Sequence, residues 1–214
     1  MKARAVHFVA PRRVELREVD LPGPPEGSIL VATEWSGISS GTELLAYRGE
    51  IDPDLPLDET LGALAGTFAF PFRYGYSAVG RVLHPAGPFQ EGQRVFAFHP
   101  HQDRFVVDAG DAVAVGDLDP RAATLYPMVE TALQVCLDAA PRLGETAVVV
   151  GLGAVGALAA ALLARAGAVV NARASARART GVARDALGCL MVPSCFLVMC
   201  FYVWFCAAPG AATQ

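Results

Sequence analysis

The chain has 214 residues, of which 53% are hydrophobic and 18% charged, and its formal net charge is −4. This composition supplies enough apolar side chains for a buried core and excludes global disorder. Nucleic-acid binding requires a basic face, which this charge does not indicate, so we expect no nucleic-acid partner. Residues 1–6 lack the long apolar run of a signal peptide and are typical of a strand, so the expected location is cytoplasmic.

Short apolar runs separated by Gly and Pro predict a β-rich first part of about 120 residues. The run 14–18, for example, alternates apolar and charged residues as a half-buried strand does. Many short strands at this spacing are typical of a barrel or a sandwich. The expected strands are 3–9, 14–18, 28–36, 79–84, 93–98, 104–108 and 112–115.

Helical spacing replaces the strand pattern near Pro120, which can occupy the first position of a helix capped by Asp119. A helix is predicted over 121–140, and Pro127 is expected to kink or split it. The apolar residues at helical spacing are Ala122, Ala123, Leu125, Val129, Leu133 and Leu137.

A glycine-rich turn, Gly151-Leu152-Gly153-Ala154-Val155-Gly156, fits the pattern G-x-G-x-x-G. The run 146–150 before it predicts a parallel strand buried on both faces, and the run 158–166 after it predicts a helix that ends at Gly167. In this context, Gly151 permits the turn, Gly153 lets a diphosphate approach the backbone, and Gly156 lets the helix pack on the strand. We therefore expect these six residues to bind NAD or NADP at a helix N-terminus. The alternative is a glycine-rich turn without a ligand.

The strand after this helix begins at Val169-Val170, but no acidic residue follows it until Asp185. An acid about 20 residues after the glycines would bind the adenosine ribose. Two interpretations remain open. Arg173 or Arg177 contacts the 2′-phosphate of NADP, or the native-like sequence has already ended and these arginines have no role, which is the interpretation we favour.

The order of these elements and several local segments resemble the medium-chain dehydrogenase/reductase superfamily over residues 1–170. This resemblance implies an α/β fold, with a GroES-like β-barrel followed by an incomplete Rossmann (doubly wound) domain and a small-molecule substrate in the cleft between them. The expected domains are a substrate domain over 1–120, the start of the Rossmann domain over 121–170 and an atypical tail over 171–214. The matching segments are 14–19 with Pro22, Ser36-Gly37-Ile38-Ser39-Ser40-Gly41-Thr42-Glu43, Gly75-Tyr76-Ser77-Ala78-Val79-Gly80-Arg81-Val82 and Gly92-Gln93-Arg94-Val95.

The zinc ligands of that family are replaced in this sequence. Ser40 stands where the family has a cysteine ligand, Tyr76 and Ser77 replace its His-Glu pair, and Tyr126 falls at another acidic position of the zinc site. The family's four-cysteine structural lobe is also missing, because four of the five cysteines lie in the last 26 residues. Serine and tyrosine are poor zinc ligands. We therefore predict neither a catalytic nor a structural zinc.

Without zinc, the charge that develops on a substrate oxygen must be handled by hydrogen bonds and proton transfer. Ser40, Thr42, Tyr76 and Tyr126 are the candidate catalytic residues, because they occupy the family's metal positions; a tyrosine that is merely part of the core is the competing interpretation. The implied function is an NAD(P)-dependent oxidoreductase that moves a hydride between nicotinamide and an alcohol or carbonyl substrate. Among zinc-free relatives, the segments resemble the bacteriochlorophyllide dehydrogenase branch, whose members oxidise a hydroxyethyl group on a tetrapyrrole.

The sequence His99-Pro100-His101 could hold a metal, but Pro100 favours a loop at the cleft or on the surface. The tail over 188–208 is almost wholly apolar. We interpret it first as the product of a shifted reading frame or a truncated gene, then as a membrane anchor, and third as an unusual native domain. On the first interpretation the chain could be a non-catalytic remnant or binding module that retains only the barrel. We do not expect a membrane partner, and a homo-oligomer is compatible with the sequence.

Overall fold

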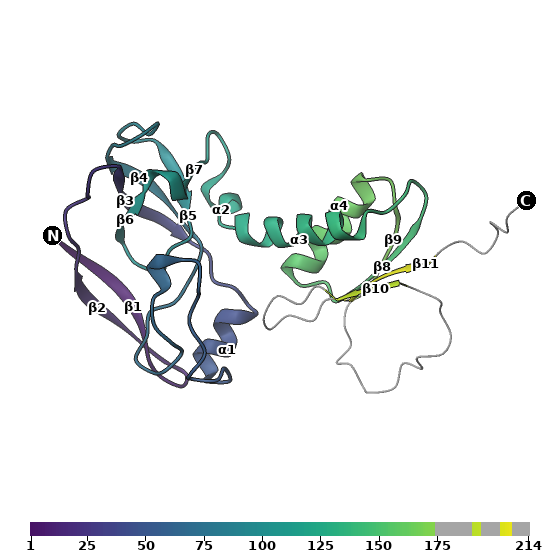
Figure 1. Cartoon of the computed structure of the whole chain (residues 1–214), viewed down its shortest axis with the longest axis horizontal. Helices are drawn as coiled ribbons and strands as arrows, with labels where there is room; N and C mark the ends of the chain where they lie inside the picture. Colours follow the sequence, from purple (N-terminus) through teal and green to yellow (C-terminus); the bar gives the residue numbers. More distant parts are fainter. Residues whose placement is uncertain (174–189, 194–201, 207–214) are drawn as a thin grey trace, which may run out of the picture. The chain divides into compact units, whose positions relative to one another are not determined.

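The computed structural model describes residues 1–173 and the strands Leu190–Pro193 and Tyr202–Cys206. The chain divides into two compact units, Met1–Pro127 and Met128–Gln214. Figure 1 shows the strands of the first unit in purple to teal, and α4, β8 and β9 of the second unit in green with β10 and β11 in yellow. Each unit has its own hydrophobic core.

The first unit contains a five-stranded antiparallel sheet, in the order β6-β3-β4-β5-β7, and a hairpin of β1 and β2. Each strand predicted for this part of the sequence is present, and the ends differ by at most two residues. The strands are β1 (Lys2–Ala10), β2 (Arg13–Asp20), β3 (Ser28–Ser36), β4 (Ala78–His84), β5 (Arg94–Ala97), β6 (Arg104–Asp108) and β7 (Ala112–Ala114).

The hairpin is joined to the rest of the unit through β1. The Val6 amide donates to the His101 carbonyl at 2.9 Å, and Phe8 exchanges backbone hydrogen bonds with Phe72. One core lies on the sheet, around Ile29 and Phe105. A second, aromatic core contains Phe8 and Phe72, whose rings stack with centroids 5.1 Å apart. The aromatic core therefore fixes β1 against the segment that leads to β4.

Short helices complete the first unit. Helix α1 (Thr42–Arg48) follows β3, and the 3-10 turns η1 (Gly62–Leu64) and η2 (Ala109–Asp111) lie in connections. Helix α2 (Pro120–Ala123) begins as the sequence predicts, because the Asp119 carboxylate accepts a hydrogen bond from the Arg121 amide at 2.7 Å. Helix α3 (Tyr126–Ala139) follows and belongs to the second unit from Met128 onward. The predicted split of the long helix is thus confirmed, just before Pro127.

The second unit contains a parallel βαβ crossover made of β8 (Thr146–Val150), α4 (Ala154–Arg165) and β9 (Val169–Arg173). Gly167 follows helix α4, and its φ of 92° lies in the left-handed region that favours glycine. The sequence predicts this residue as the helix end. Strand β11 (Tyr202–Cys206) pairs antiparallel with the other edge of β8, and β10 (Leu190–Pro193) pairs with β11. A doubly wound sheet is parallel, so β11 departs from that pattern.

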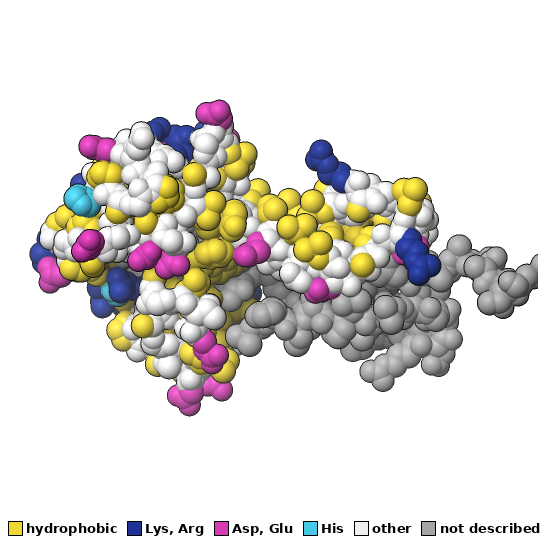
Figure 2. All heavy atoms as spheres, turned by 45° about the horizontal axis from the view of Figure 1, so that its top comes forward, with side chains coloured by type: hydrophobic (Ala, Val, Ile, Leu, Met, Phe, Trp, Pro, Cys, Tyr) yellow, Lys and Arg dark blue, Asp and Glu magenta, His cyan; other side chains and the backbone are white. Residues whose placement is uncertain are grey.

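One expectation about burial in the second unit is wrong. Strand β8 is not buried on both faces, because Ala147 and Val149 are buried while Val150 is 41% exposed. The cause is that α3 and α4 pack on one face of β8 (Figure 1), and no helix among the described residues covers the other. The apolar residues of α3 at the predicted spacing also point outward, and Leu133 is 45% exposed. Figure 2 shows hydrophobic side chains exposed along this helix, whose buried face carries Ala132, Val135 and Cys136 instead.

The tail is described only at β10 and β11, so these two segments are strands and not parts of a spanning helix. No helix of the described residues is long and apolar enough to cross a membrane. Arg177, Asp185 and the remaining tail residues lie outside the described part of the chain.

Candidate active site

The glycine motif lies between β8 and α4, the context that the sequence predicts. Gly151 has a φ of 99°, a backbone conformation that residues other than glycine rarely adopt. A Cβ on Gly156 would lie 1.9 Å from the Gly151 carbonyl oxygen, so the helix approaches the turn too closely for any other residue. These two glycines therefore build the strand–turn–helix geometry.

Gly153 has a different environment. A Cβ built there meets nothing within 4 Å, and its φ of −72° is ordinary, so the fold itself does not require a glycine. No side chain caps the first amides of α4 at this residue. Uncapped amides at a helix N-terminus are donors suited to a phosphate. The turn thus fits a dinucleotide's diphosphate, which could approach over Gly153.

Arg173 is the last residue of β9, and its backbone lies beside the turn. The Gly151 amide donates to the Arg173 carbonyl at 2.9 Å, and the arginine side chain is exposed. The end of this second parallel strand is where an adenosine ribose is recognised in dinucleotide-binding folds. Arg173 therefore lies at the expected position, while Arg177 is outside the described residues.

Tyr76, in the first unit, is the centre of a cluster of hydroxyl groups. The side chains of Ser39 and Thr42 lie near it and lower its pKa. Burial raises the pKa of Tyr76, the charge of Glu43 raises it further, and the two hydroxyl contacts oppose this rise. Two of the predicted residues, Tyr76 and Thr42, are therefore together.

The other two candidates occupy different environments. Ser40 is exposed, and its neighbour Ser39, which is 8% exposed, takes the place beside Tyr76. Tyr126 is 39% exposed and packs its ring on Phe96, with centroids 4.7 Å apart. No contact between Tyr126 and the hydroxyl cluster is found among the described residues.

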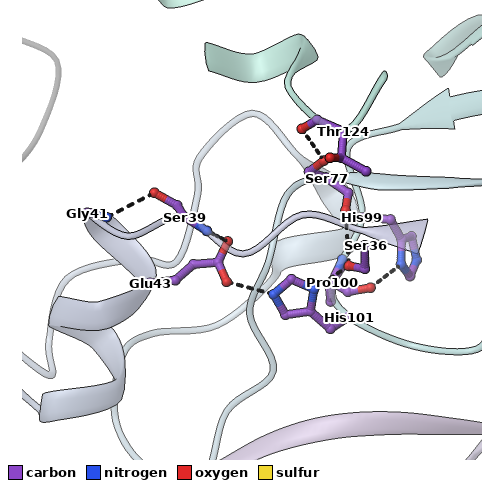
Figure 3. A network of polar contacts seen from close by, with 9 residues as sticks. All are labelled: Ser36, Ser39, Gly41, Glu43, Ser77, His99, Pro100, His101 and Thr124. Atoms are coloured by element: carbon purple, nitrogen blue, oxygen red, sulfur yellow. Dashed lines mark hydrogen bonds and ion pairs between the residues drawn. The ribbon is translucent and has the colours of Figure 1, made fainter. Parts of the chain in front are cut away.

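A buried network that the sequence did not predict adjoins this cluster (Figure 3). His101 Nε2 and Glu43 Oε2 are 2.6 Å apart, and Glu43 Oε1 accepts a hydrogen bond from the Ser39 amide at 3.0 Å. His101 Nδ1 hydrogen-bonds with Ser36 Oγ, which also donates to the Ser77 carbonyl at 3.0 Å. Helix α1 supplies Glu43 and the loop before β6 supplies His101, so the network ties two distant segments to the end of β3.

His99 and His101 therefore do not lie on a surface loop, which corrects one interpretation of His99-Pro100-His101. They are 7% and 8% exposed. His99 stacks on Phe105 with ring centroids 4.3 Å apart, and its Nδ1 lies 3.0 Å from the Pro100 carbonyl oxygen. Packing between β1 and the sheet buries this loop, because the backbone of β1 pairs directly with it.

The positions that correspond to the family's zinc ligands carry hydroxyl side chains in this sequence, namely Ser40, Tyr76 and Ser77. Ser77, at the position of an acidic ligand, is buried and donates its hydroxyl to the Thr124 carbonyl at 2.8 Å. Within the described residues, no three of His, Cys, Asp and Glu gather where they could hold a metal. Hydroxyls already engaged in hydrogen bonds do not fit a tetrahedral zinc.

The buried His99 makes the stability of the fold dependent on pH. Burial lowers the pKa of His99 to about 4, from 6.5 in an exposed histidine. Between these values the unfolded chain binds a proton that the folded chain excludes, so stability is full above pH 6.5 and falls as the pH drops towards 4. We expect His99 to contribute a loss of about 3 kcal/mol over this range. Urea unfolding of wild type and His99→Phe at several pH values measures it, and equal pH dependence of the two would contradict the assignment.

No family model matches the sequence. A quinone oxidoreductase from Coxiella burnetii superposes with a TM-score of 0.66 at 21% identity, covering 83% of this chain and 58% of that one. An alcohol dehydrogenase from Pyrobaculum aerophilum gives 0.65 at 20% identity, covering 80% and 59%. A quinone oxidoreductase from Thermus thermophilus, whose structure was also determined with NADPH, gives 0.59 at 24% identity, covering 81% and 54%.

These likenesses establish the fold class: a GroES-like β-barrel followed by a Rossmann-type crossover, as in the medium-chain dehydrogenase/reductases. In sequence, the chain is 35% identical over 98 residues to the 2-desacetyl-2-hydroxyethyl bacteriochlorophyllide A dehydrogenase of Cereibacter sphaeroides. That match covers 45% of this chain and 27% of the relative. The chain thus spans little more than half of the solved structures and about a quarter of the curated relative. The resemblance to this superfamily of oxidoreductases is confirmed.

Proposed function

We propose that the chain is an NAD(P)-dependent oxidoreductase that transfers a hydride between nicotinamide and an alcohol or carbonyl substrate without zinc. The observation that carries this proposal is the glycine turn between β8 and α4, where Gly156 leaves no room for a side chain and Gly153 leaves the helix amides open. We assign residues 1–120 to substrate binding and 121–170 to dinucleotide binding. The nicotinamide would supply the hydride.

The chain's own residues would manage the proton. Tyr76 can donate its hydroxyl proton to a carbonyl oxygen during reduction, or accept one from an alcohol during oxidation. The hydroxyl side chains of Thr42 and Ser39, which lower the pKa of Tyr76, would orient its hydroxyl. This role needs no metal, and it explains how serine and tyrosine can stand where relatives have zinc ligands.

Turnover in the presence of a chelator tests the function. The chain is incubated with NADH or NADPH, a chelator and a panel of carbonyl compounds. The panel includes an acetyl-bearing tetrapyrrole, because the relative in Cereibacter sphaeroides is a hydroxyethyl bacteriochlorophyllide dehydrogenase. We expect oxidation of the cofactor that the chelator does not change and that Tyr76→Phe reduces about 100-fold or more. Turnover that stops with the chelator and returns with zinc would contradict the zinc-free mechanism.

The position of Arg173 favours NADP over NAD. An exposed arginine at the end of β9, where an acid would bind the ribose, can form charge-assisted hydrogen bonds with a 2′-phosphate. We expect Arg173→Asp to weaken NADPH binding about tenfold and to leave NADH binding the same or tighter. Fluorescence titration with both cofactors measures the ratio, and Arg165→Asp, at the opposite end of α4 from the turn, is the matched charge control. An unchanged ratio in Arg173→Asp would remove this assignment.

A second candidate function is a non-catalytic binding module that consists of the barrel. The first unit has hydrophobic cores of its own. In the second unit, β11 pairs antiparallel with β8, whereas a doubly wound sheet is parallel. Limited proteolysis separates the two candidates. A stable fragment that ends near Pro127, with the rest degraded even in NADPH, favours the module, whereas protection of β8 to β9 by NADPH favours the oxidoreductase.

A further inference from the structure

One pocket of the first unit does not enter the proposed function. It has a volume of about 270 Å³ and is lined by His7 of β1 and by residues of the segment 57–73, which leads to β4. A ligand of about nine non-hydrogen atoms would fill this space, because a water molecule takes roughly 30 Å³ of the liquid. No acidic residue lines the pocket, whereas Arg73 and His7 bring nitrogen donors to it.

Arg73 supplies the positive charge of this pocket. Its exposed side chain forms no ion pair with any residue that the structure describes. The guanidinium donates from Nη1 to Gln102 Oε1 at 3.2 Å, and Gln102, which is 7% exposed, donates in turn to the Arg104 carbonyl. A buried amide therefore orients the guanidinium from one side, and its remaining N–H groups are available to a ligand.

Two backbone donors border the same pocket. Gly66 and Thr67 line it, and the described part of the chain holds no acceptor for either amide. Other amides of this turn are satisfied, because Leu57 donates to the Gly66 carbonyl at 2.9 Å and Phe68 donates to the Leu55 carbonyl at 3.1 Å. Backbone amides without acceptors in a loop are suitable partners for an anion.

The acidic residues closest in sequence to this region are engaged elsewhere. Asp58 accepts the Thr60 amide at 2.7 Å, and Asp103 pairs with Arg4 at 3.1 Å. Neither carboxylate lines the pocket. Within the described residues, the charge of Arg73 is thus left for a ligand to neutralise.

Apart from these donors, the side chains that line the pocket are apolar. Phe72 and Leu57, which are 6% and 7% exposed, belong to the aromatic core, and three alanines and a proline complete the lining. A hydrocarbon group can pack against such walls, whereas a strongly hydrated anion would lose water there without compensation. The lining therefore favours an anion that carries one charge on a hydrocarbon frame.

We propose that this pocket binds a small organic carboxylate. The planar guanidinium of Arg73 presents parallel N–H donors that match the two oxygens of a carboxylate. The amides of Gly66 and Thr67 add donors, and the hydrocarbon part of the ligand packs on Phe72 and Leu57. This binding does not depend on the oxidoreductase assignment, so either can fail without the other.

A titration of the isotope-labelled full chain with benzoate, followed by NMR at constant ionic strength, tests the site. We expect the Arg73 Nε signal and the amide signals of Gly66 and Thr67 to shift saturably. Arg73→Gln should weaken the binding about tenfold or more. Arg104→Gln, which changes an exposed arginine outside the lining, is the matched control and should bind benzoate as the wild type does. Equal binding by wild type and Arg73→Gln would overturn the proposal.

Two other ligands separate the charge of benzoate from its shape. Benzamide keeps the shape without the charge, and inorganic phosphate keeps a charge without the hydrocarbon, so each should bind about tenfold more weakly or less. Either ligand binding as tightly as benzoate would overturn the assignment to an organic carboxylate.

A second variant tests the site if Arg73→Gln does not fold. Ala69 is exposed and lines the pocket, so Ala69→Phe fills the space while Arg73 stays in place. We expect this variant to lose benzoate binding. Undiminished binding by Ala69→Phe would show that benzoate binds elsewhere and would overturn the proposal.

Discussion

Replacing Gly156 by alanine is expected to destabilise the second unit by about 3 kcal/mol. The added Cβ would overlap the Gly151 carbonyl oxygen, 1.9 Å away, and this atom is backbone at a turn that already has a positive φ. Relief requires α4 to move away from β8, where Leu163 packs on Ala147 and Val149. Urea unfolding followed by circular dichroism measures the loss.

Gly153→Ala is the matched control for this substitution. The same methyl group then meets nothing within 4 Å on an ordinary backbone conformation, so the stability should change by less than about 0.5 kcal/mol. Binding of NADPH, by contrast, should weaken, because the methyl group occupies the approach to the helix amides. Equal destabilisation by the two substitutions would show that the close approach at Gly156 is not what holds the turn.

Replacing Glu43 by alanine is expected to cost about 4 kcal/mol of the stability of the first unit. The carboxylate is 1% exposed, and its removal leaves the Ser39 amide and His101 Nε2 without their partner in a buried site. Buried donors without acceptors lose the full cost of their desolvation. Thermal and urea unfolding should show the loss at neutral pH.

Glu34→Ala provides the comparison on the surface of the same unit. Glu34 accepts hydrogen bonds from Arg81 and Arg94, each at 2.7 Å, but its side chain is 29% exposed. Exposed ion pairs contribute at most about 1 kcal/mol. A loss in Glu43→Ala no larger than that in Glu34→Ala would mean that the buried network does not stabilise the fold.

Much of the barrel could be predicted from the sequence because its strands are bounded by local signals. The range of β3 was predicted without error, since Gly27 precedes it and Gly37 follows it, and β8 was predicted equally well as a β-branched run before Gly151. Strand ends marked by glycine or proline need no tertiary information. The helix start at Asp119-Pro120 is of the same kind.

The buried face of α3 could not be predicted in this way. Its leucines and valine recur at helical spacing, yet the small residue Ala132 and the pair Val135 and Cys136 face β8 and α4. A helix that packs closely on its neighbours has small side chains at the contact. A prediction from hydrophobic spacing alone instead places the larger apolar side chains there. The burial of this helix is set by its neighbours and not by its own pattern.

The candidate site was predicted in part. Position-by-position comparison with zinc-dependent relatives found Tyr76 and Thr42, but it selected Ser40 where the structure places Ser39 beside the tyrosine. Glu43 and His101 are 58 residues apart, so no local pattern connects them. The signal that was available is a carboxylate next to Thr42 in the matched segment, together with a histidine in a loop that has no metal ligands nearby.

Calorimetric titration of the full chain with NADPH and NADH tests the central claim most directly. If the backbone amides around Gly153 bind a dinucleotide's diphosphate, NADPH should bind saturably with one molecule per chain, and Gly153→Ala should weaken this binding while remaining folded. Absence of any heat or saturation with either cofactor, in a preparation whose circular dichroism and unfolding are cooperative, would contradict the claim.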